Sequence, residues 1–355
     1  MTAGGVMDIV SVPEAIEWQA THAEQAGAPG TAQVVRALLA LEDSEAATAR
    51  RIFAWQGLSL RDAMPLRIAG GIHNLLLNGD EPRLEAVYAG RMPSQADVDA
   101  LSKELVETQD ARLLPWLDGP PQTNEAGRSA SFAAALLWLA DGRTSPVFEW
   151  LEIGASAGIN TMMGRYRYEL GDVHVGPQGS PMIITPEWRG NSPPNTQFTL
   201  VAARGNDIAP VDLTDKAEAL RLKSFVWPEA TGRMARIDAA IMLAEDEPPH
   251  IDRMDAGQWV KAELAKPQDK GVTRVLAHSI MWQYLPDATQ DLIEESMQEA
   301  GARASADKPF AHISLETNRE TFAHELHVRY WPGGGEAVHL ANAHPHGAWV
   351  EWLGG

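Results

Sequence analysis

Apolar residues in the first 142 positions recur at spacings of three and four, the pattern of helices that bury one face. The clearest runs cover residues 34–41 and 68–76. Pro65 and Gly119 interrupt the pattern, as is usual between helices. No run of β-branched residues in this region is typical of a strand. We therefore expect residues 1–145 to form an all-α N-terminal domain.

The pattern changes at Pro146, where short apolar runs of strand length begin. A helix is expected after the first of these runs, as far as Tyr168, and another over residues 288–300. Strands separated by helices predict a mainly parallel sheet, and the last runs predict an antiparallel C-terminal hairpin. Residues 146–355 are thus expected to form an α/β domain. The expected strands cover residues 147–153, 198–203, 272–278, 310–315, 324–330 and 348–353.

Charge and composition narrow the classes of partner. The chain of 355 residues carries a formal net charge of −19, so its surface repels a phosphate backbone and nucleic acid is not an expected partner. The absence of cysteine excludes disulfides, thiolate metal sites and cysteine nucleophiles. A small-molecule ligand is the expected partner on the grounds given below, and the oligomeric state is left open.

The N-terminal residues 1–13 lack the basic stretch and apolar run of a signal peptide. The longest apolar stretch, residues 133–140, is much shorter than a membrane span. We expect a cytoplasmic protein without a membrane partner.

The turn after the first expected strand is the main candidate ligand site. Glu152 ends the strand, and Gly154, Ser156, Gly158 and Asn160 follow it. Glycine lets a backbone approach a ligand closely, a helix start offers unpaired amide donors, and an acid can accept bonds from ligand hydroxyl or amino groups. Parallel sheets bind ligands beyond the carboxyl ends of their strands, where this turn lies. The alternative is that these small residues only let a helix pack closely on the sheet.

The segment Gly154–Gly158 also matches the nucleophile elbow of α/β-hydrolases, in which a strained turn exposes a serine. Ser156 would then act with Asp255 or Glu316 and with His344 or His346. Two features argue against this reading. The elbow normally follows several strands, whereas the pattern before the first expected strand is helical throughout. It also needs an upstream oxyanion loop, but the glycine pair at residues 70 and 71 lies inside a helical pattern.

Several short motifs spread along most of the chain carry a family resemblance. They are the segments 122–128, 151–160, 186–190, 204–212, 278–285, 331–334 and 344–347, with a weaker likeness at 70–73. Together they resemble a bacterial family catalogued as domain of unknown function 2332. This likeness implies no particular activity.

The part of the chain from residue 146 onward is also similar, more distantly, to class I S-adenosylmethionine-dependent methyltransferases. That resemblance implies a Rossmann-like core, S-adenosylmethionine as cofactor and methyl transfer to a small molecule. Residues 152–158 would hold the amino-acid part of the cofactor, Asp207 its ribose hydroxyls, and Asp255 with Ala256 its adenine. The sequence departs from the pattern in the long segment 171–197. A protein that binds a nucleotide without catalysis is a further alternative.

The same resemblance places the segment after the fourth parallel strand beside the substrate. His278 is the candidate general base and Tyr284 a second catalytic candidate, while Trp282 and Gln283 are candidate substrate contacts. The alternative for each aromatic residue is ordinary packing.

Asn124, Glu125 and Arg128 stand on an expected helix just before the first strand, where they either bind the substrate or form a surface pair. His344 and His346 are further candidate substrate contacts. Pro345 between them indicates a loop rather than a strand with both histidines on one face. His312 and His324 lie upstream, but no acid at the spacing of a metal-ligand motif completes a site, so no metal site is expected. The candidate substrate contacts are thus Asn124, Glu125, Arg128, Trp282, Gln283, His344 and His346.

Overall fold

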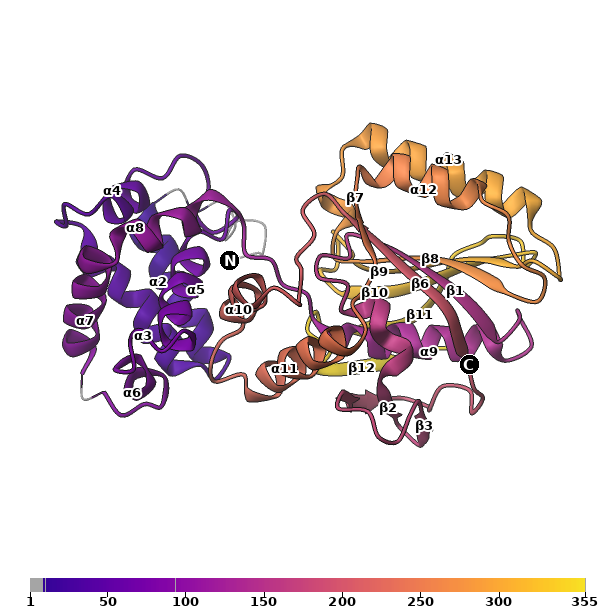
Figure 1. The fold of residues 1–355 in the computed structure, drawn as a ribbon, viewed down its shortest axis with the longest axis horizontal. Helices are drawn as coiled ribbons and strands as arrows, with labels where there is room; N and C mark the ends of the chain where they lie inside the picture. Colours follow the sequence, from indigo (N-terminus) through magenta and orange to yellow (C-terminus); the bar gives the residue numbers. More distant parts are fainter. Residues whose placement is uncertain (1–8, 10, 93, 355) are drawn as a thin grey trace. The chain divides into compact units, whose positions relative to one another are not determined.

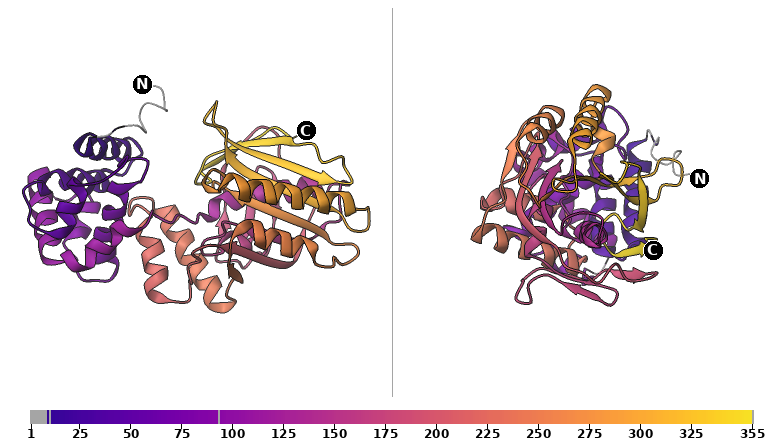
Figure 2. Two further views of the ribbon diagram at one scale, coloured as in Figure 1. Left: turned by 90° about the horizontal axis from the view of Figure 1, so that it is seen from above. Right: turned by 90° about the vertical axis from the view of Figure 1, so that its right-hand side faces the viewer.

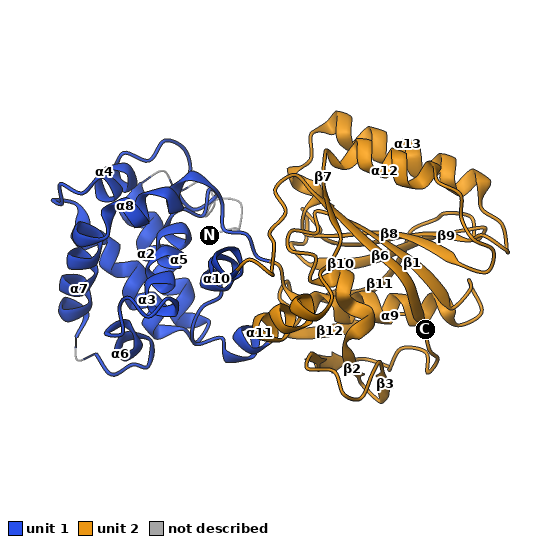
Figure 3. Ribbon diagram, viewed as in Figure 1, with its two compact units in different colours: residues 1–123, 216–235 blue, residues 124–215, 236–355 orange. Residues whose placement is uncertain are grey.

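The computed structural model describes Ile9 and residues 11–92 and 94–354 of the chain (Figure 1). The chain divides into two compact units (Figure 3). Unit 1 comprises Met1–Thr123 and Lys216–Ala235, and unit 2 comprises Asn124–Asp215 and Arg236–Gly355. The segment 124–146, which precedes β1, therefore belongs to the unit that holds the sheet, although the sequence pattern puts the domain boundary at residues 145 and 146.

Unit 1 is built from helices, as the apolar spacing predicts. The run at residues 34–41 lies in α3 and η1, and its residues Val34, Val35, Leu38 and Leu41 are fully buried in the core of the unit. Its elements are α2 (Val12–Gln25), α3 (Pro29–Ala37), η1 (Leu38–Leu41), α4 (Ala47–Phe53), α5 (Met64–Leu77), α6 (Leu84–Tyr88), α7 (Gln95–Thr108), α8 (Asp110–Leu113), η2 (Leu114–Asp118) and α10 (Lys216–Ser224).

The glycine pair in α5 has a packing role. A methyl group at Gly70 would lie 2.7 Å from Cδ1 of Phe225, and one at Gly71 would lie 2.9 Å from Cγ of Trp116. The two aromatic rings also pack edge to face, with centroids 5.3 Å apart. The pair therefore allows two aromatic rings to reach the helix backbone.

Unit 2 is organised around a nine-stranded sheet with the strand order β5-β12-β11-β10-β9-β8-β1-β6-β7. The strands from β7 to β9 in this order are parallel, whereas β9, β10, β11 and β12 pair in antiparallel fashion. A mainly parallel sheet with antiparallel C-terminal strands, following a helical N-terminal region, is thus confirmed. The strand bounds are β1 (Val147–Ile153), β5 (Glu187–Arg189), β6 (Thr199–Asp207), β7 (Ile251–Arg253), β8 (Thr273–Ser279), β9 (Phe310–Thr317), β10 (His324–Trp331), β11 (Val338–Ala343) and β12 (Trp349–Trp352).

The order of the parallel strands defines where a ligand crevice forms. Counted along the chain, the five parallel strands lie in the order third, second, first, fourth, fifth. The direction of winding reverses between β1 and β8, which are hydrogen-bonded neighbours. In open sheets of this kind the crevice lies beyond the carboxyl ends of the strands at that reversal. The turns that follow Ile153 and Ser279 are therefore the edges of the expected site.

Helices cover both faces of the sheet. Figure 1 shows α12 (Ala256–Ala265) and α13 (Asp287–Arg303) on one face and α9 (Ser129–Ala140) on the other. In Figure 2 the two orange helices α12 and α13 lie side by side over the strands, and they pack against each other. All residues of α9 from Ser129 to Leu139 are buried. Even so, within the described residues no helix is both long enough and apolar enough to cross a membrane.

The prediction of a helix from the glycine turn as far as Tyr168 is wrong. The turn leads into the short 3-10 helix η4 (Asn160–Arg165), and β2 (Arg167–Leu170) follows it. Together with β3 (Val173–Val175) and β4 (Ile183–Ile184), β2 forms a separate three-stranded sheet. The physical reason lies in alternation: Tyr166, Tyr168 and Leu170 are fully buried at every second position, which is the period of a strand.

Two strands also differ from the expected ranges. The strand expected at residues 198–203 extends to Asp207, so this acid ends β6 instead of following it. β11 was not predicted, and it turns the expected C-terminal hairpin into a longer antiparallel run. The segment 171–197 contributes β3, β4 and the edge strand β5, which pairs with β12.

Gly205 offers a test of the packing between β6 and the glycine turn. A methyl group at this position would lie 2.6 Å from Ala155 Cβ and 2.6 Å from Ile251 Cδ1. Gly205→Ala should therefore lower the free energy of unfolding by about 1–3 kcal/mol, the usual cost of overpacking, as measured by urea denaturation. The control Gly179→Ala, with open space around the new methyl group, should change it by less than about 0.5 kcal/mol. Equal effects of the two substitutions would show that β6 does not press on the turn.

Candidate functional site

Backbone strain is concentrated at the carboxyl ends of the central strands. Among the described residues four non-glycine residues have a positive φ, and three of them follow β1, β8 and β9: Ser156 (53°), Ile280 (51°) and Phe322 (59°). The left-handed conformation costs about 1–3 kcal/mol for such residues, and a β-branched isoleucine adopts it rarely. Strain of this kind gathers where a fold holds a functional geometry, here the edge predicted from the strand order.

The glycine turn is held from both sides by hydrogen bonds. The carboxylate of Asp207 accepts bonds from the backbone N–H of Ser156 (2.8 Å) and of Ala209 (2.9 Å). The side-chain oxygen of Asn124 accepts a bond from the N–H of Ile159 (3.0 Å). Gly154 and Gly158 have φ of 65° and 72°, which glycine adopts without strain. Asp207 and Asn124 thus fix the turn, which is a structural use of residues predicted as ligand contacts.

The end of β1 contains a buried and only partly bonded carboxyl group. Glu152 is 1% exposed, and its Oε1 accepts one bond from Asn160 Nδ2 at 3.2 Å. Its Oε2 has no hydrogen-bond partner among the described residues, nor do Asn160 Oδ1 and Ser156 Oγ. A buried polar atom without a partner costs about 1–3 kcal/mol. Three such atoms on neighbouring residues mark this turn as the place where a polar ligand would be stabilised.

Burial also controls the protonation of Glu152. Loss of solvent raises the pKa of its carboxyl group to about 7, against the lowering effects of the Asn160 and Trp150 side chains and of the charge of Arg128. A carboxyl group with this pKa is partly neutral at neutral pH. A cation bound beside it would shift it to the charged form.

A second polar group lies at the ends of β8 and β9 and consists of His278, His312 and Glu316. His278 Nδ1 lies 2.7 Å from Glu316 Oε1, and its Nε2 lies 3.0 Å from Nε2 of His312. Burial lowers the pKa of His312 well below its usual value, and His278 adds to this effect. Burial alone would raise the pKa of Glu316, but the hydrogen bond with His278 holds it below its ordinary value. A charged Glu316 therefore accepts from His278 Nδ1–H, and the Nε2 atoms of His278 and His312 share the second hydrogen bond.

This bonding changes the role expected for His278. The side chain is 2% exposed and both ring nitrogens are engaged by protein groups, so neither nitrogen meets a substrate in this arrangement. Instead, Glu316 Oε1 also accepts bonds from the N–H groups of Met281 (3.1 Å) and Trp282 (3.3 Å). The Trp282 ring stacks on the imidazole of His278 at 4.9 Å. His278 positions Glu316, and Glu316 positions the strained loop after β8.

The two strand ends touch each other. A methyl group at Gly154 would lie 2.8 Å from Met281 Cγ, so the methionine side chain rests directly on the glycine turn. Met281 is partly exposed and belongs to the loop that Glu316 holds. Its flexible side chain therefore covers the turn at the position where a ligand would enter.

Two distant predicted segments also come together. Arg128 Nε donates to the carbonyl of Pro345 at 2.8 Å, and a methyl group at Gly127 would lie 2.6 Å from the carbonyl of His346. Glu125 is buried and accepts a bond from Arg236 Nε at 2.7 Å, so it forms no simple surface pair with Arg128. The segment is not the continuous helix that was expected. Glu125 instead caps the 3-10 helix η3 (Ala126–Arg128), and α9 follows.

The remaining predicted residues lie apart from the turn or have structural partners. Tyr284 is 75% exposed in η5 (Trp282–Tyr284), and Gln283 is exposed beside it. Asp255 caps α12 by accepting from Gln258 N at 3.0 Å. Ala256 is buried in the cluster of α12 and α13, and His344 Nδ1 accepts from the N–H of His346 at 3.1 Å.

The hydrolase arrangement is not formed. Ser156 has the left-handed backbone of a nucleophile elbow, yet its Oγ is buried without a hydrogen-bond partner among the described residues. Glu316, one of its candidate acids, is bonded to His278 instead. The serine thus lacks the base that would activate it.

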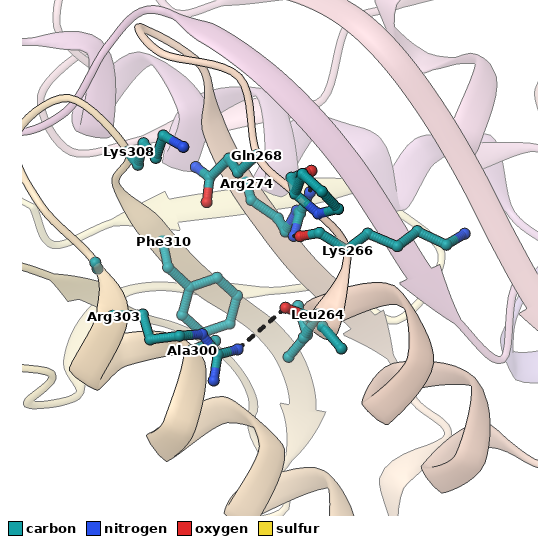
Figure 4. Close-up of a pocket in the computed structure, with 11 residues that line it drawn as sticks. Leu264, Lys266, Gln268, Arg274, Ala300, Arg303, Lys308 and Phe310 are labelled. Atoms are coloured by element: carbon teal, nitrogen blue, oxygen red, sulfur yellow. Dashed lines mark hydrogen bonds between the residues drawn. The ribbon is translucent and has the colours of Figure 1, made fainter.

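A pocket lies at the opposite end of the sheet, near the starts of β8 and β9 (Figure 4). It is lined by Arg274 and Phe310 of these strands and by Lys266, Arg303 and Lys308. Two of the cations already have carboxylate partners, Arg274 with Glu149 and Lys266 with Glu263. Figure 4 shows Arg303 bonded to the Leu264 carbonyl. Paired charges of this kind favour a structural role.

Glu316 and His312 are the residues that reasoning from the sequence did not connect with His278. They stand 38 and 34 positions after it and meet it only because β8 and β9 are adjacent and parallel. The usable signal was the alternation of His312, Ser314 and Glu316 along one strand, which places all three on one face.

The raised pKa of Glu152 predicts a specific dependence of stability on pH. Between its unfolded value of 4.5 and its folded value of about 7, the folded state retains the proton more strongly. Stability contributed by the protonated group is therefore lost as the pH rises through this interval, by roughly 3 kcal/mol in total. Glu152→Gln should remove this loss, so that the stability of the variant relative to the wild type increases from pH 5 to pH 8 in urea denaturation. Parallel pH profiles for the two proteins would contradict the assignment.

Comparison with known proteins identifies the family. A search of curated proteins gave no match, and a search of solved structures gave none either. One family model, described as an uncharacterized protein conserved in bacteria, matches residues 13–352 of the chain. This confirms the resemblance found in the motifs, and the chain belongs to the DUF2332 family.

Proposed function

We propose that unit 2 binds S-adenosylmethionine at the carboxyl ends of β1 and β8 and transfers its methyl group to a small molecule. The observation that carries this proposal is the buried carboxyl group of Glu152, whose Oε2 has no partner among the described residues, at the winding reversal of a parallel sheet. The strand order is a feature of nucleotide-binding sheets, which bind their ligand at this reversal.

The charge of the ligand fits the chemistry of this carboxyl group. The amino-acid end of S-adenosylmethionine carries an ammonium group, which offers three donors and a positive charge. Ionised Glu152 can accept one of these bonds through Oε2 while Oε1 keeps its bond to Asn160. Because Glu152 is buried, water would compete little for this bond, and the bound cation would favour the ionised form of the carboxyl group.

Asn160 and the turn supply the next contacts. The side-chain oxygen of Asn160 has no partner among the described residues and can accept a second donor from the same ammonium group. Asp207 ends the neighbouring strand β6, where a ribose would lie, and its two oxygens already accept one backbone bond each. A carboxylate has about four acceptor positions, so two hydroxyl donors can be added.

The acceptor of the methyl group would lie against the loop after β8. Met281 covers Gly154 and must move aside, and its unbranched side chain permits this at low cost. Glu316 and His278 hold the backbone of this loop in place and do not exchange protons with the substrate. The exposed side chains of Gln283 and Tyr284 are then available to the acceptor.

Isothermal titration with S-adenosylmethionine tests the proposal. Glu152→Gln keeps the shape of the side chain but removes its charge, and it should weaken binding about 10- to 100-fold, as for the loss of a hydrogen bond to a charged group. Glu169→Gln, at an exposed position of β2, is the matched control and should bind as tightly as the wild type. Absence of heat with folded wild-type protein, or equal affinity for both glutamine variants, would refute the proposal.

A serine hydrolase is the second candidate, favoured by the left-handed conformation of Ser156. Because Ser156 Oγ has no base within hydrogen-bond distance among the described residues, we expect a fluorophosphonate probe to leave the protein unlabelled. Labelling of the wild type that disappears in Ser156→Ala, measured by intact-mass spectrometry, would favour the hydrolase over methyl transfer.

A further inference from the structure

Two histidines and a glutamate meet on neighbouring strands β10 and β11, away from the glycine turn. We refer to Glu325, His327 and His339 as the β10–β11 cluster. Each offers one possible ligand atom, and these three atoms lie within 4.8 Å of one another. The two imidazole rings are stacked at 4.8 Å, and His327 Nε2 lies 3.7 Å from Glu325 Oε2. Two ligands of one tetrahedral zinc ion lie about 3.3 Å apart, so only small shifts are needed for a common ion.

A β-bulge brings the cluster together. Leu326 pairs with Ala341, but the next residue, His327, pairs with His339, so the register skips Leu340. Without this extra residue Leu340, which is buried, would stand opposite His327. Bulges re-aim side chains and are frequent beside functional sites. The bulge therefore places the second imidazole next to the first.

Hydrogen bonds to neighbouring groups orient the possible ligands. Asn318 Nδ2 donates to Glu325 Oε1 at 2.8 Å, while the other oxygen, Oε2, is the one nearest to His327. His339 Nε2 lies 3.1 Å from the carbonyl of Ala341 and 3.1 Å from Asn342 Oδ1. Both are acceptors, so Nε2 carries the proton and Nδ1 keeps its lone pair for a cation. Ligand histidines in metal sites are held in this way by an outer acceptor.

We infer that the β10–β11 cluster binds a divalent transition-metal ion, with Zn²⁺ as the first choice. Two imidazoles and one carboxylate are ligands that suit zinc, and they resemble the three-ligand sets that leave a further position for water or substrate. The Glu325 side chain is 16% exposed and that of His327 33% exposed, so an ion can enter from solvent. This inference does not depend on S-adenosylmethionine binding.

The cluster shares a sheet face with the group formed by His278, His312 and Glu316. In the pairing of β9 with β10, Glu325 stands opposite Glu316 and His327 stands opposite Ser314. Residues that pair directly point to the same side of a sheet. A metal ion here would lie one strand away from the carboxylate that holds the loop after β8, on the face covered by α12 and α13.

The test is titration of the untagged, metal-free full chain with Zn²⁺ in a calorimeter and with Co²⁺ followed by visible absorption. We expect one saturable site and a ligand-field spectrum of bound Co²⁺. Separate His327→Ala and His339→Ala substitutions should each weaken affinity at least tenfold, and Glu325→Gln, which keeps the side chain's shape, should weaken it as well. His174→Ala, at an exposed position of β3, is the control for unspecific binding by histidine and should leave affinity unchanged.

The outcomes separate clearly. Saturable binding by the wild type and by the His174 variant, lost in the three cluster variants with unchanged far-ultraviolet circular dichroism, supports the site. If the wild type binds no more tightly than Glu325→Gln, or if His174→Ala weakens binding as much as His327→Ala, the inference is wrong. Glu325→Gln keeps the test valid if a histidine variant fails to fold.

Discussion

The carboxyl group of Glu152 is the constraint around which unit 2 is arranged. It stands at the end of the central strand with 1% of its surface exposed, so ionising it without a partner is costly. Asn160 supplies a single bond, and burial raises the pKa to about 7. Folded proteins seldom keep such a group in a core without use. The turn that follows it is held by hydrogen bonds to Asp207 and Asn124, and it contains polar atoms that have no partner among the described residues.

The surrounding fold holds this geometry at several points. Asp207 fixes Ser156 in a strained conformation, and Glu316 fixes the loop that contains strained Ile280. The two loops meet where Met281 rests on Gly154. Because both anchors are carboxylates that accept backbone N–H bonds, the edge of the sheet is rigid in its backbone and adaptable in the methionine that covers it. A rigid frame under a flexible side chain is suited to a ligand that must enter and leave.

Part of this arrangement could be predicted from the sequence because its signals are local. The apolar run 147–153 and the small residues after it give β1 and the turn directly, and three-and-four spacing gives the helices of unit 1. β2 was missed because a helix normally follows such a turn, although the alternation of Tyr166 and Tyr168 indicated a strand. Long-range groups gave no local signal. His278 meets Glu316 through strand pairing, and His339 meets His327 only because the register skips a residue.

We propose that the buried carboxyl group of Glu152 binds the cationic group of a ligand. The titration of this carboxyl group tests the proposal most directly. In protein labelled with ¹³C at glutamate carboxyl carbons, the resonance absent from Glu152→Gln identifies the group. We predict that it titrates near pH 7 in the free protein, as its burial requires, and that S-adenosylmethionine moves the midpoint to lower pH. A midpoint at the ordinary glutamate value of about 4.3, or one that the ligand leaves unchanged, would contradict the account.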